Sequence, residues 1–307
     1  MKQFKIKSAL FATAIMLVFS SCGGSKEKYT LVYNVNSGDT FEQLITTDVI
    51  LNQNVMGQIM SVRTSMEMLA VYSINAVEEN AIDMDFVFES IGMSMISDFF
   101  EMSFDSNTTS VFATEEDLSP MLKALTNLPF NMVVDRRGNV QSVSGLEQIM
   151  EAMVAVLGDE IDEQTKQQML AQFDQQFSSE SMQTTMGQSL TVFPEHPIRV
   201  GESWTTTTTV NAGVAMTTEV TTTLKSVRGN IAVLESKGEF STDAPIVQNM
   251  HDAETQMTMT GTQSGTMEID MNTGWVVGGE MVQNIKSEID FQGMKIVQEI
   301  VSTTTIK

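Results

Sequence analysis

Cysteine is almost absent from this sequence: Cys22 is the only one among 307 residues. No disulfide can form within the chain, so the burial of side chains must hold the fold together. Basic residues are also scarce, with 17 Lys and Arg against 39 Asp and Glu, which gives a formal net charge of -22. A chain this acidic does not bind nucleic acid or anionic membranes by general electrostatic attraction.

The common catalytic motifs are missing as well. The two histidines, His196 and His251, lie far apart, and no Gly-x-Ser-x-Gly, His-Glu-x-x-His or phosphate-binding Gly-Lys-Ser/Thr motif occurs. Asp83 and Asp85 share one strand face, where solvated negative charge is the simpler interpretation. We therefore expect a protein that is not an enzyme, with no catalytic residues, no cofactor and no metal site.

The amino-terminal segment has the pattern of a secretory signal peptide over residues 1–21. Three lysines lie within the first seven residues, and an apolar run follows from Ala9 to Phe19, before Ser20 and Ser21. The apolar run is much shorter than the ~20 residues that a membrane-spanning helix needs. Removing residues 1–21 changes the formal charge to -25, from 14 basic minus 39 acidic residues.

The residues that end at Cys22 resemble a bacterial lipobox, with Phe19 where leucine is more usual. This resemblance implies lipid on the Cys22 sulfur, cleavage before it and acylation of the new amino terminus. Two or more acyl chains anchor a protein firmly, at ~0.8 kcal/mol per buried methylene. Residues 22–28 would then form a tether. The other interpretation is an ordinary secreted protein with a stray thiol.

The resemblance also suggests where the anchor lies. Gly23 stands where aspartate would favour the inner membrane, and no acidic run follows the cysteine. We expect a lipid anchor in the outer membrane that faces the periplasm, with exposure at the cell surface left open.

Alternation with a period of two predicts strands in the second half of the chain. From Met257 to Met271 every even position is polar. Such alternation is typical of a half-buried strand. The odd positions are mostly apolar or small: Met257, Met259, Gly261, Gln263, Gly265, Met267, Ile269 and Met271.

The first half shows the same signature. One predicted face carries Met66, Met68, Ala70, Tyr72, Ile74 and Ala76, and a second strand aligns Ile82, Met84, Phe86 and Phe88. The apolar phase changes after Glu89, which predicts a β-bulge near Ser90.

The middle of the chain has helical spacing instead. Leu146, Ile149, Met150, Met153 and Leu157 predict a helix that Gly158 ends, and a second helix follows from Asp159. A short helix is also predicted near residues 116–125.

Together these patterns predict a mainly β, β-rich α+β fold. Two curved antiparallel β-meander blocks, residues 29–144 and 193–307, form either a half-barrel or one large sheet, with a helical insert at 145–192 packing across them. Each block opens on a similar motif, Gly38-Asp39-Thr40-Phe41 in the first and Gly201-Glu202-Ser203-Trp204 in the second. Both tryptophans, Trp204 and Trp275, are expected to be core aromatics.

The segment that leads into the second block carries a family resemblance. Its motif residues are Pro194, Pro197, Val200, Gly201, Glu202, Ser203 and Trp204. This pattern resembles an uncharacterised family of Gram-negative bacterial lipoproteins, a domain of unknown function whose members combine a lipobox with two β blocks. The resemblance implies location and architecture, and no activity.

Three roles stay open. A structural or protein-interaction module comes first. The second is a carrier of a hydrophobic ligand or lipid, whose groove Met257, Met259, Gly261, Gly265 and Met267 would line, with the glycines leaving space. The third is Cu(I) binding, because thioethers suit that ion. Its candidate ligand pairs are Met66/Met68, Met93/Met95 and Met257/Met259.

Overall fold

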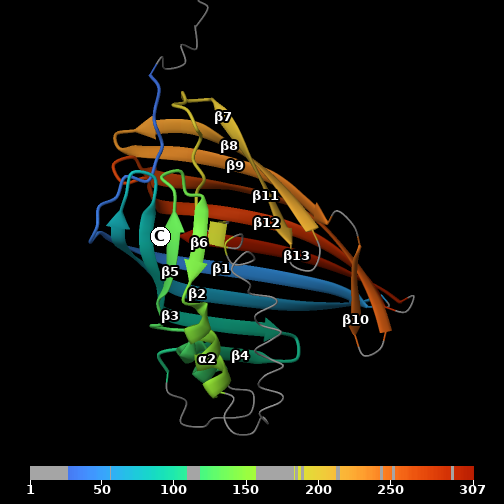
Figure 1. The fold of residues 1–307 in the computed structure, drawn as a ribbon. Helices are drawn as coiled ribbons and strands as arrows, with labels where there is room; N and C mark the ends of the chain where they lie inside the picture. Colours follow the sequence, from blue (N-terminus) through green and yellow to red (C-terminus); the bar gives the residue numbers. More distant parts are fainter. Residues whose placement is uncertain are drawn as a thin grey trace, which may run out of the picture.

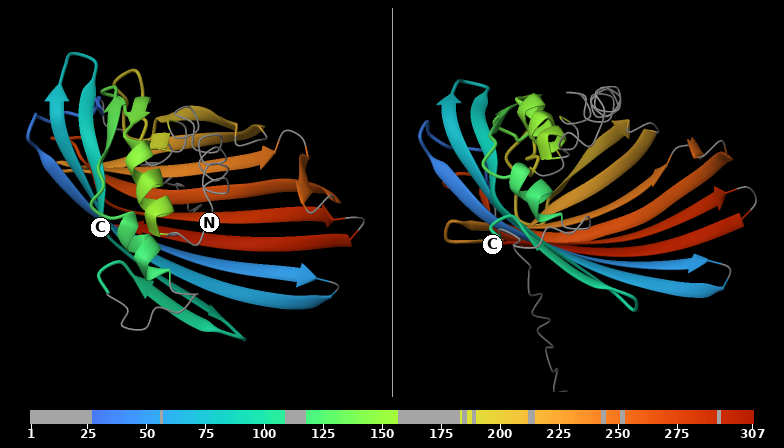
Figure 2. Two further views of the ribbon diagram at one scale, coloured as in Figure 1. Left: turned by 60° about the horizontal axis from the view of Figure 1, so that its bottom comes forward. Right: turned by 90° about the horizontal axis from the view of Figure 1, so that it is seen from below.

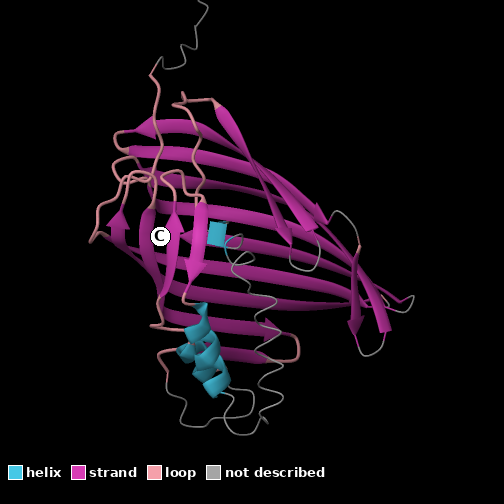
Figure 3. Ribbon diagram, in the orientation of Figure 1, coloured by secondary structure: helices cyan, strands magenta, loops and turns pink. Residues whose placement is uncertain are grey.

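The computed structural model describes residues 27–55, 57–108, 118–156, 183, 186–187, 190–211, 215–242, 245–250, 253–291 and 294–307. Within these residues the chain is mainly β, as the alternating patterns predict, and Figure 3 shows how few helices accompany the strands. The elements in chain order are β1 (Thr40–Val55), β2 (Gln58–Val77), β3 (Ile82–Ser97), β4 (Glu101–Asp105), α1 (Ser119–Ala124), β5 (Phe130–Val134), β6 (Val140–Ser144), α2 (Leu146–Val156), β7 (Ser203–Asn211), β8 (Ala215–Arg228), β9 (Ile231–Thr242), β10 (Ile246–Met250), β11 (Ala253–Asp270), β12 (Trp275–Phe291) and β13 (Met294–Ile306).

The strands of the described chain form one antiparallel sheet of 13 strands. Its order is β6-β5-β3-β2-β1-β13-β12-β11-β9-β8-β7, with β4 beside β3 and β10 beside β11. The two predicted blocks meet where β1 pairs with β13, beginning with Ile45 opposite Ile306. The interpretation as one large sheet is therefore confirmed.

The sheet is strongly curved, and its concave and convex faces are covered differently. In Figures 1 and 2 the helices α1 and α2 lie on the concave side, together with β5 and β6. We call this the inner face. The apolar phase of the strands points to it, and the polar phase points to the outer face, as the period of two requires.

Two irregularities shape the pairing of β2 with β3. Leu69 pairs with Ser90 and Ala70 pairs with Phe88, which leaves Glu89 without a partner in the register. This confirms the predicted β-bulge. A second register shift lies between Ile74 and Ala76. The prediction that Ala76 shares the apolar face was wrong, because this shift ends the alternation and leaves its side chain exposed.

The two matched motifs adopt the same local structure. Asp39 accepts a hydrogen bond from the backbone N–H of Asn36 (2.7 Å), and Glu202 accepts one from that of Arg199 (2.8 Å). Each acid is preceded by a glycine at positive φ, 90° for Gly38 and 93° for Gly201. The turn thus starts the first strand of each half in the same way.

The main core lies at one end of the sheet, where the hairpins β2–β3, β8–β9 and β11–β12 turn. Segments before β1 and β7 cover this end and bury Tyr33 and Phe193, whose ring centroids are 5.1 Å apart. Trp275 is 4% exposed and stacks on Phe41 at 4.2 Å. Trp275 is thus a core aromatic as predicted, and Trp204 packs half-buried against the same core.

The helical predictions are confirmed where the chain is described. α1 falls within residues 116–125, and its Leu122 forms a small second core with Ile91 and Phe104. α2 begins at Leu146 as expected. Gly158 and the second helix from Asp159 lie outside the described residues, as do Cys22 and the signal peptide. Residues 190–192, which the predicted insert includes, are not helical. Over the described ranges, the structure contains no helix with the length and apolar character to cross a membrane.

Candidate functional site

A groove runs along the inner face of the second half of the sheet. It consists of two adjoining hollows of about 400 Å³ and about 290 Å³. They adjoin each other, because five residues line both: Leu190, Thr191, Met267, Met281 and Gln283. Both volumes fall near the lower limit of small-molecule sites, and together they form an elongated space.

The two ends of the groove differ in their linings. The smaller hollow is the aromatic end, where Tyr33, Tyr72 and Trp275 meet Ile45 and Ile306. The larger hollow is the far end, which extends over β7, β8, β9, β11 and β12. Its lining includes Val220, Phe240, Met259 and Ile285 with threonines such as Thr206, Thr208 and Thr218.

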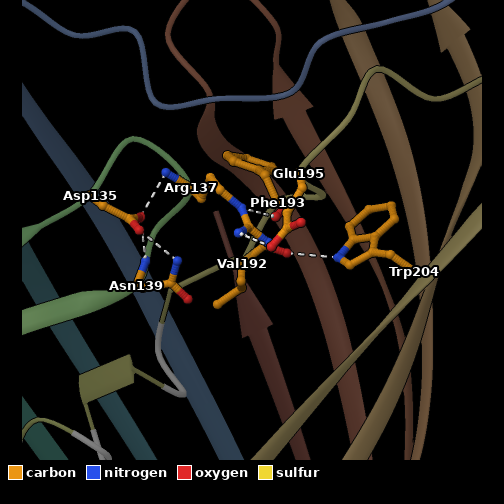
Figure 4. A network of polar contacts seen from close by, with 7 residues as sticks. All are labelled: Asp135, Arg137, Asn139, Val192, Phe193, Glu195 and Trp204. Atoms are coloured by element: carbon orange, nitrogen blue, oxygen red, sulfur yellow. Dashed lines mark hydrogen bonds and ion pairs between the residues drawn. The ribbon is translucent and has the colours of Figure 1, made fainter. Parts of the chain in front are cut away.

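One wall of the groove is the beginning of an extended strap, which we define as residues 190–200. Arg137, in the β5–β6 turn, donates from Nε to the Phe193 carbonyl (3.0 Å) and pairs with Glu195 (3.0 Å). The Trp204 indole N–H donates to the Val192 carbonyl (2.8 Å). Figure 4 shows this network, in which Asp135 orders the turn that carries Arg137. The contacts hold the strap across the core end, so Leu190, Thr191 and Val192 can line the groove.

No charged side chain faces the groove among the described residues. Glu280 is the one acidic residue at its edge, but its neighbour Met281 points inward, so the exposed Glu280 side chain lies on the outer face. The alternation accounts for this absence in a chain of net charge -22, because the charged residues of these strands occupy the polar phase. The polar groups that do line the groove are neutral amides and hydroxyls.

Two glutamines lie directly opposite each other in the middle of the groove. Gln263 of β11 pairs in register with Gln283 of β12, and Gln283 Nε2 donates to Gln263 Oε1 (3.2 Å). Within the described part of the chain, Gln263 Nε2 and Gln283 Oε1 make no other hydrogen bond. A third amide, Gln43, is buried at the aromatic end and donates to the Val276 carbonyl (3.1 Å).

Both tyrosines at the aromatic end are uncharged at any physiological pH. Burial raises the pKa of the Tyr33 phenol well above its usual value, partly offset by the N–H of Thr191, which donates to its oxygen (3.2 Å). Burial alone raises the pKa of Tyr72 in the same direction. The two phenols therefore act as neutral hydrogen-bonding groups.

This burial predicts a loss of stability in alkali. Below about pH 10 both phenols keep their protons in the folded and unfolded states, so they add no pH dependence. Above it the unfolded chain loses protons that the folded chain retains, and the free energy of unfolding falls by about 1.4 kcal/mol per tyrosine for each pH unit. Urea titrations between pH 9 and 11 measure this slope. Tyr72→Phe should remove the part of the slope that this phenol contributes, and an unchanged slope would contradict the assignment.

A further hollow lies on the outer face and is a different kind of surface. It has a volume of about 1360 Å³ and is lined by charged and hydroxyl side chains such as Glu219, Lys237, Thr262, Lys286 and Glu299. It is a broad trough open to solvent. The inner groove is smaller but more enclosed and more apolar, which are the properties of a ligand site.

The predicted groove residues fall at different places. Met259 and Met267 line the groove, whereas Met257 lies in neither hollow. The glycines do not leave open space. The Phe240 ring lies where a Cβ of Gly261 would be, and the Glu280 carbonyl lies where that of Gly265 would be. Both glycines therefore permit close packing, and the free space lies farther along the face.

Sequence reasoning missed most of the groove. Tyr33, Gln43 and Leu190–Val192 lie far in sequence from β11, and no local pattern joins them. Gln263 and Gln283 did carry a signal, because Gln263 is a polar residue in the apolar phase of its strand.

The proposed copper ligands are brought together only in part. On the inner face Met66 lies opposite Met93, and Met95 lies opposite Met102. Met93 and Met102 pack half-buried against the second core, which fits an apolar role. Met259 belongs to the groove on β11, away from this group.

The remaining candidates for chemistry are dispersed. His196 is exposed in the strap, and His251 lies outside the described residues. Asp83 and Asp85 both accept hydrogen bonds from the amide of Asn131, at 2.6 and 3.0 Å. In the described ranges no three His, Cys, Asp or Glu side chains gather as a metal site would require.

Comparison with solved structures gives weak similarities. A structure entitled "Lipid-protein interactions in lipovitellin" has a TM-score of 0.48 at 9% identity over 89% of this chain, which spans only 25% of the lipovitellin chain. The Salmonella typhi OmpF complex with daunomycin has a TM-score of 0.25 at 7% identity, over 90% of this chain and 100% of OmpF. Pseudomonas aeruginosa OpdQ has a TM-score of 0.26 at 5% identity, over 88% and 99% of the two chains. Similarity at this level supports no functional argument.

At the level of sequence, no curated protein matches the chain significantly. A family model, described as a family of unknown function (DUF6263), matches residues 79–276, from the β2–β3 turn to the start of β12. The expected resemblance to a domain of unknown function is thereby confirmed, and the lipoprotein character stays a prediction. The chain belongs to the family of unknown function DUF6263.

Proposed function

We propose that this chain is a non-catalytic binding protein of the bacterial cell envelope that holds an elongated apolar ligand, such as an acyl chain, in the inner groove. The two adjoining, partly enclosed hollows on the inner face are the observation that carries the proposal. A packed core would leave no such space, because protein interiors contain few voids larger than a water molecule.

The lining supports the same conclusion. Methionine side chains are flexible and adapt to apolar ligands of different shape, and Met259, Met267 and Met281 are spread along the groove. The aromatic end offers large flat surfaces, and the strap adds the apolar side chain of Leu190 to the lining. Burying a chain of methylenes here contributes ~0.8 kcal/mol for each group removed from water.

The sequence alone places a structural or protein-interaction role first. Exposed apolar side chains at the ends of two neighbouring hairpins favour that role as the second candidate: Ile59 is 72% exposed and Phe99 is 80% exposed. β2 and β3 are adjacent, with Val62 opposite Ser97, so these two ends lie on the same edge of the molecule.

Binding of a neutral apolar probe tests the proposal. The mature protein, titrated with N-phenylnaphthylamine, should raise the fluorescence of the probe to a plateau at one equivalent, and lipid should be found by mass spectrometry in protein purified from its native host. If the probe stays dark and no lipid copurifies, ligand binding is wrong and the interaction role is the better supported one.

The location rests on Cys22, which lies outside the described residues. Replacing Cys22 with alanine should move the protein from the membrane fraction to the soluble fraction, because no acyl chain can then be attached. Ser21→Ala is the matched control, since a small residue before the cut is retained. Intact mass spectrometry should give a mature chain that begins at Cys22 and carries fatty acyl groups. A chain that begins elsewhere, or a Cys22→Ala variant that stays in the membrane, would overturn the lipid anchor.

A further inference from the structure

We infer that the ligand is an uncharged lipid whose ester or amide group lies at Gln263 and Gln283, with apolar parts extending toward both ends of the groove. This inference rests on the proposed function and names the chemical class that the groove selects. The observations that carry it are the neutral lining and the position of the two opposed glutamines.

The position of the glutamine pair is central. Gln283 lines both hollows, and Gln263 lines the larger one directly opposite it. Met267, Met281 and the aromatic side chains lie on one side, and Phe240, Met259 and Ile285 lie on the other. A ligand that extends from one hollow into the other therefore passes the amides.

The free hydrogen-bonding groups of the pair suit a neutral carbonyl compound. Because Gln283 Nε2 donates to Gln263 Oε1 (3.2 Å), Gln263 Nε2 is left to donate to a ligand carbonyl oxygen. Gln283 Oε1 is left to accept from a ligand N–H or hydroxyl. An amide satisfies both groups, and an ester satisfies the donor. Leaving such groups unsatisfied beneath an apolar ligand would lose their hydrogen bonds to water without replacement.

A charged head group does not suit this position. No Lys, Arg or His among the described residues lines the groove, so a buried carboxylate or phosphate would have no counter-ion. A cationic head would find no inward-facing carboxylate either, because the acidic side chains lie on the outer face. Desolvation of an unpaired charge disfavours both.

Displacement of N-phenylnaphthylamine by a matched series of ligands tests the inference. Decanamide, methyl decanoate, decanoate and decyltrimethylammonium have the same chain and differ in the head group. At pH 8 decanamide should displace the probe at a concentration about tenfold lower than decanoate, with the methyl ester between them and the cation no better than decanoate. Decanoate or the cation equal to or better than decanamide would overturn the inference.

A double variant shows whether the two glutamines cause the preference for a ligand amide. Gln263→Leu with Gln283→Leu keeps the size of the side chains and removes both amides. Each ligand is compared by its displacement of the probe from the variant itself, so a change in probe affinity does not affect the order. Decanamide should lose its advantage over the methyl ester, because both hydrogen bonds to its amide are removed, whereas decanoate should stay disfavoured because the groove still offers no counter-ion. Retention of the preference for decanamide over the ester would also overturn the inference. Circular dichroism checks that the variant folds, and the wild-type series decides the question by itself if it does not. Failure of the proposed function looks different, because the wild type would then not bind the probe at all.

Discussion

The Thr304→Trp variant is expected to bind N-phenylnaphthylamine at least about thirtyfold more weakly than the wild type, a loss of about 2 kcal/mol. Thr304 lies on β13 at the aromatic end of the groove, opposite Met281, and its hydroxyl is 3.1 Å from that of Thr47. The hollow there has a volume of about 290 Å³. An indole ring placed in it occupies the space that the probe would fill.

The neighbouring residue provides the control. Thr303→Trp adds the same side chain to the same strand but on the opposite face, because successive residues of a strand alternate. Its register partners are Asp48 and Val282. This variant should bind the probe as the wild type does, and the melting temperatures of the two variants show whether both fold. Equal binding by wild type and Thr304→Trp would mean that the probe binds somewhere other than the inner groove.

Gly274→Ala is expected to lower the free energy of unfolding by about 3–5 kcal/mol, a large part of the stability of a typical domain. Gly274 ends the β11–β12 turn at a φ of 75°, where a side chain is strained. A Cβ there would also overlap the backbone of the segment before β1, only 2.7 Å from the Val32 carbonyl carbon and 2.9 Å from the Tyr33 Cα. This segment cannot yield easily, because Asn34 donates to the Thr273 carbonyl (2.8 Å) and Tyr33 is buried in the core.

Gly229→Ala separates the cost of the positive φ from the cost of the overlap with the segment before β1. Gly229 also has a positive φ, 60°, but no atom lies within 4 Å of the position of its Cβ. Its replacement should therefore cost only the conformational part, about 1 kcal/mol. Urea unfolding of both variants gives the comparison. If the two losses are equal, the segment before β1 does not press on the turn, and the packing at this end of the sheet is looser than the structure describes.

Much of the fold could be predicted because its signals are local. The alternation in β11 assigns each side chain to a face, and the change of phase after Glu89 marks the bulge. Ala76 shows the limit of this reasoning, since a register shift with the partner strand ends the alternation there. The pairing of β1 with β13 could not be predicted in this way, because it joins residues near opposite ends of the sequence. The alternation in either strand is compatible with other neighbours.

The candidate site was less predictable, because it also depends on contacts between segments that are distant in the sequence. The odd positions of β11 identified the inner face, and Met259 and Met267 do line the groove. The space itself depends on which side chains fill it. Phe240 covers Gly261, although the two are 21 positions apart in the sequence, and the strap reaches the groove only because Arg137 and Trp204 hold it there.

The sequence by itself determined the period of the strands, the faces they present and the acidic character of the chain, because each depends on a residue and its near neighbours. It also contains the lipobox pattern around Cys22. Only the tertiary structure decided that the two halves share one sheet, that the glycines of β11 are covered, and that two glutamines face each other in an uncharged groove. These properties arise from contacts between distant segments, whose free energy depends on shape and burial together, and no single stretch of residues specifies them.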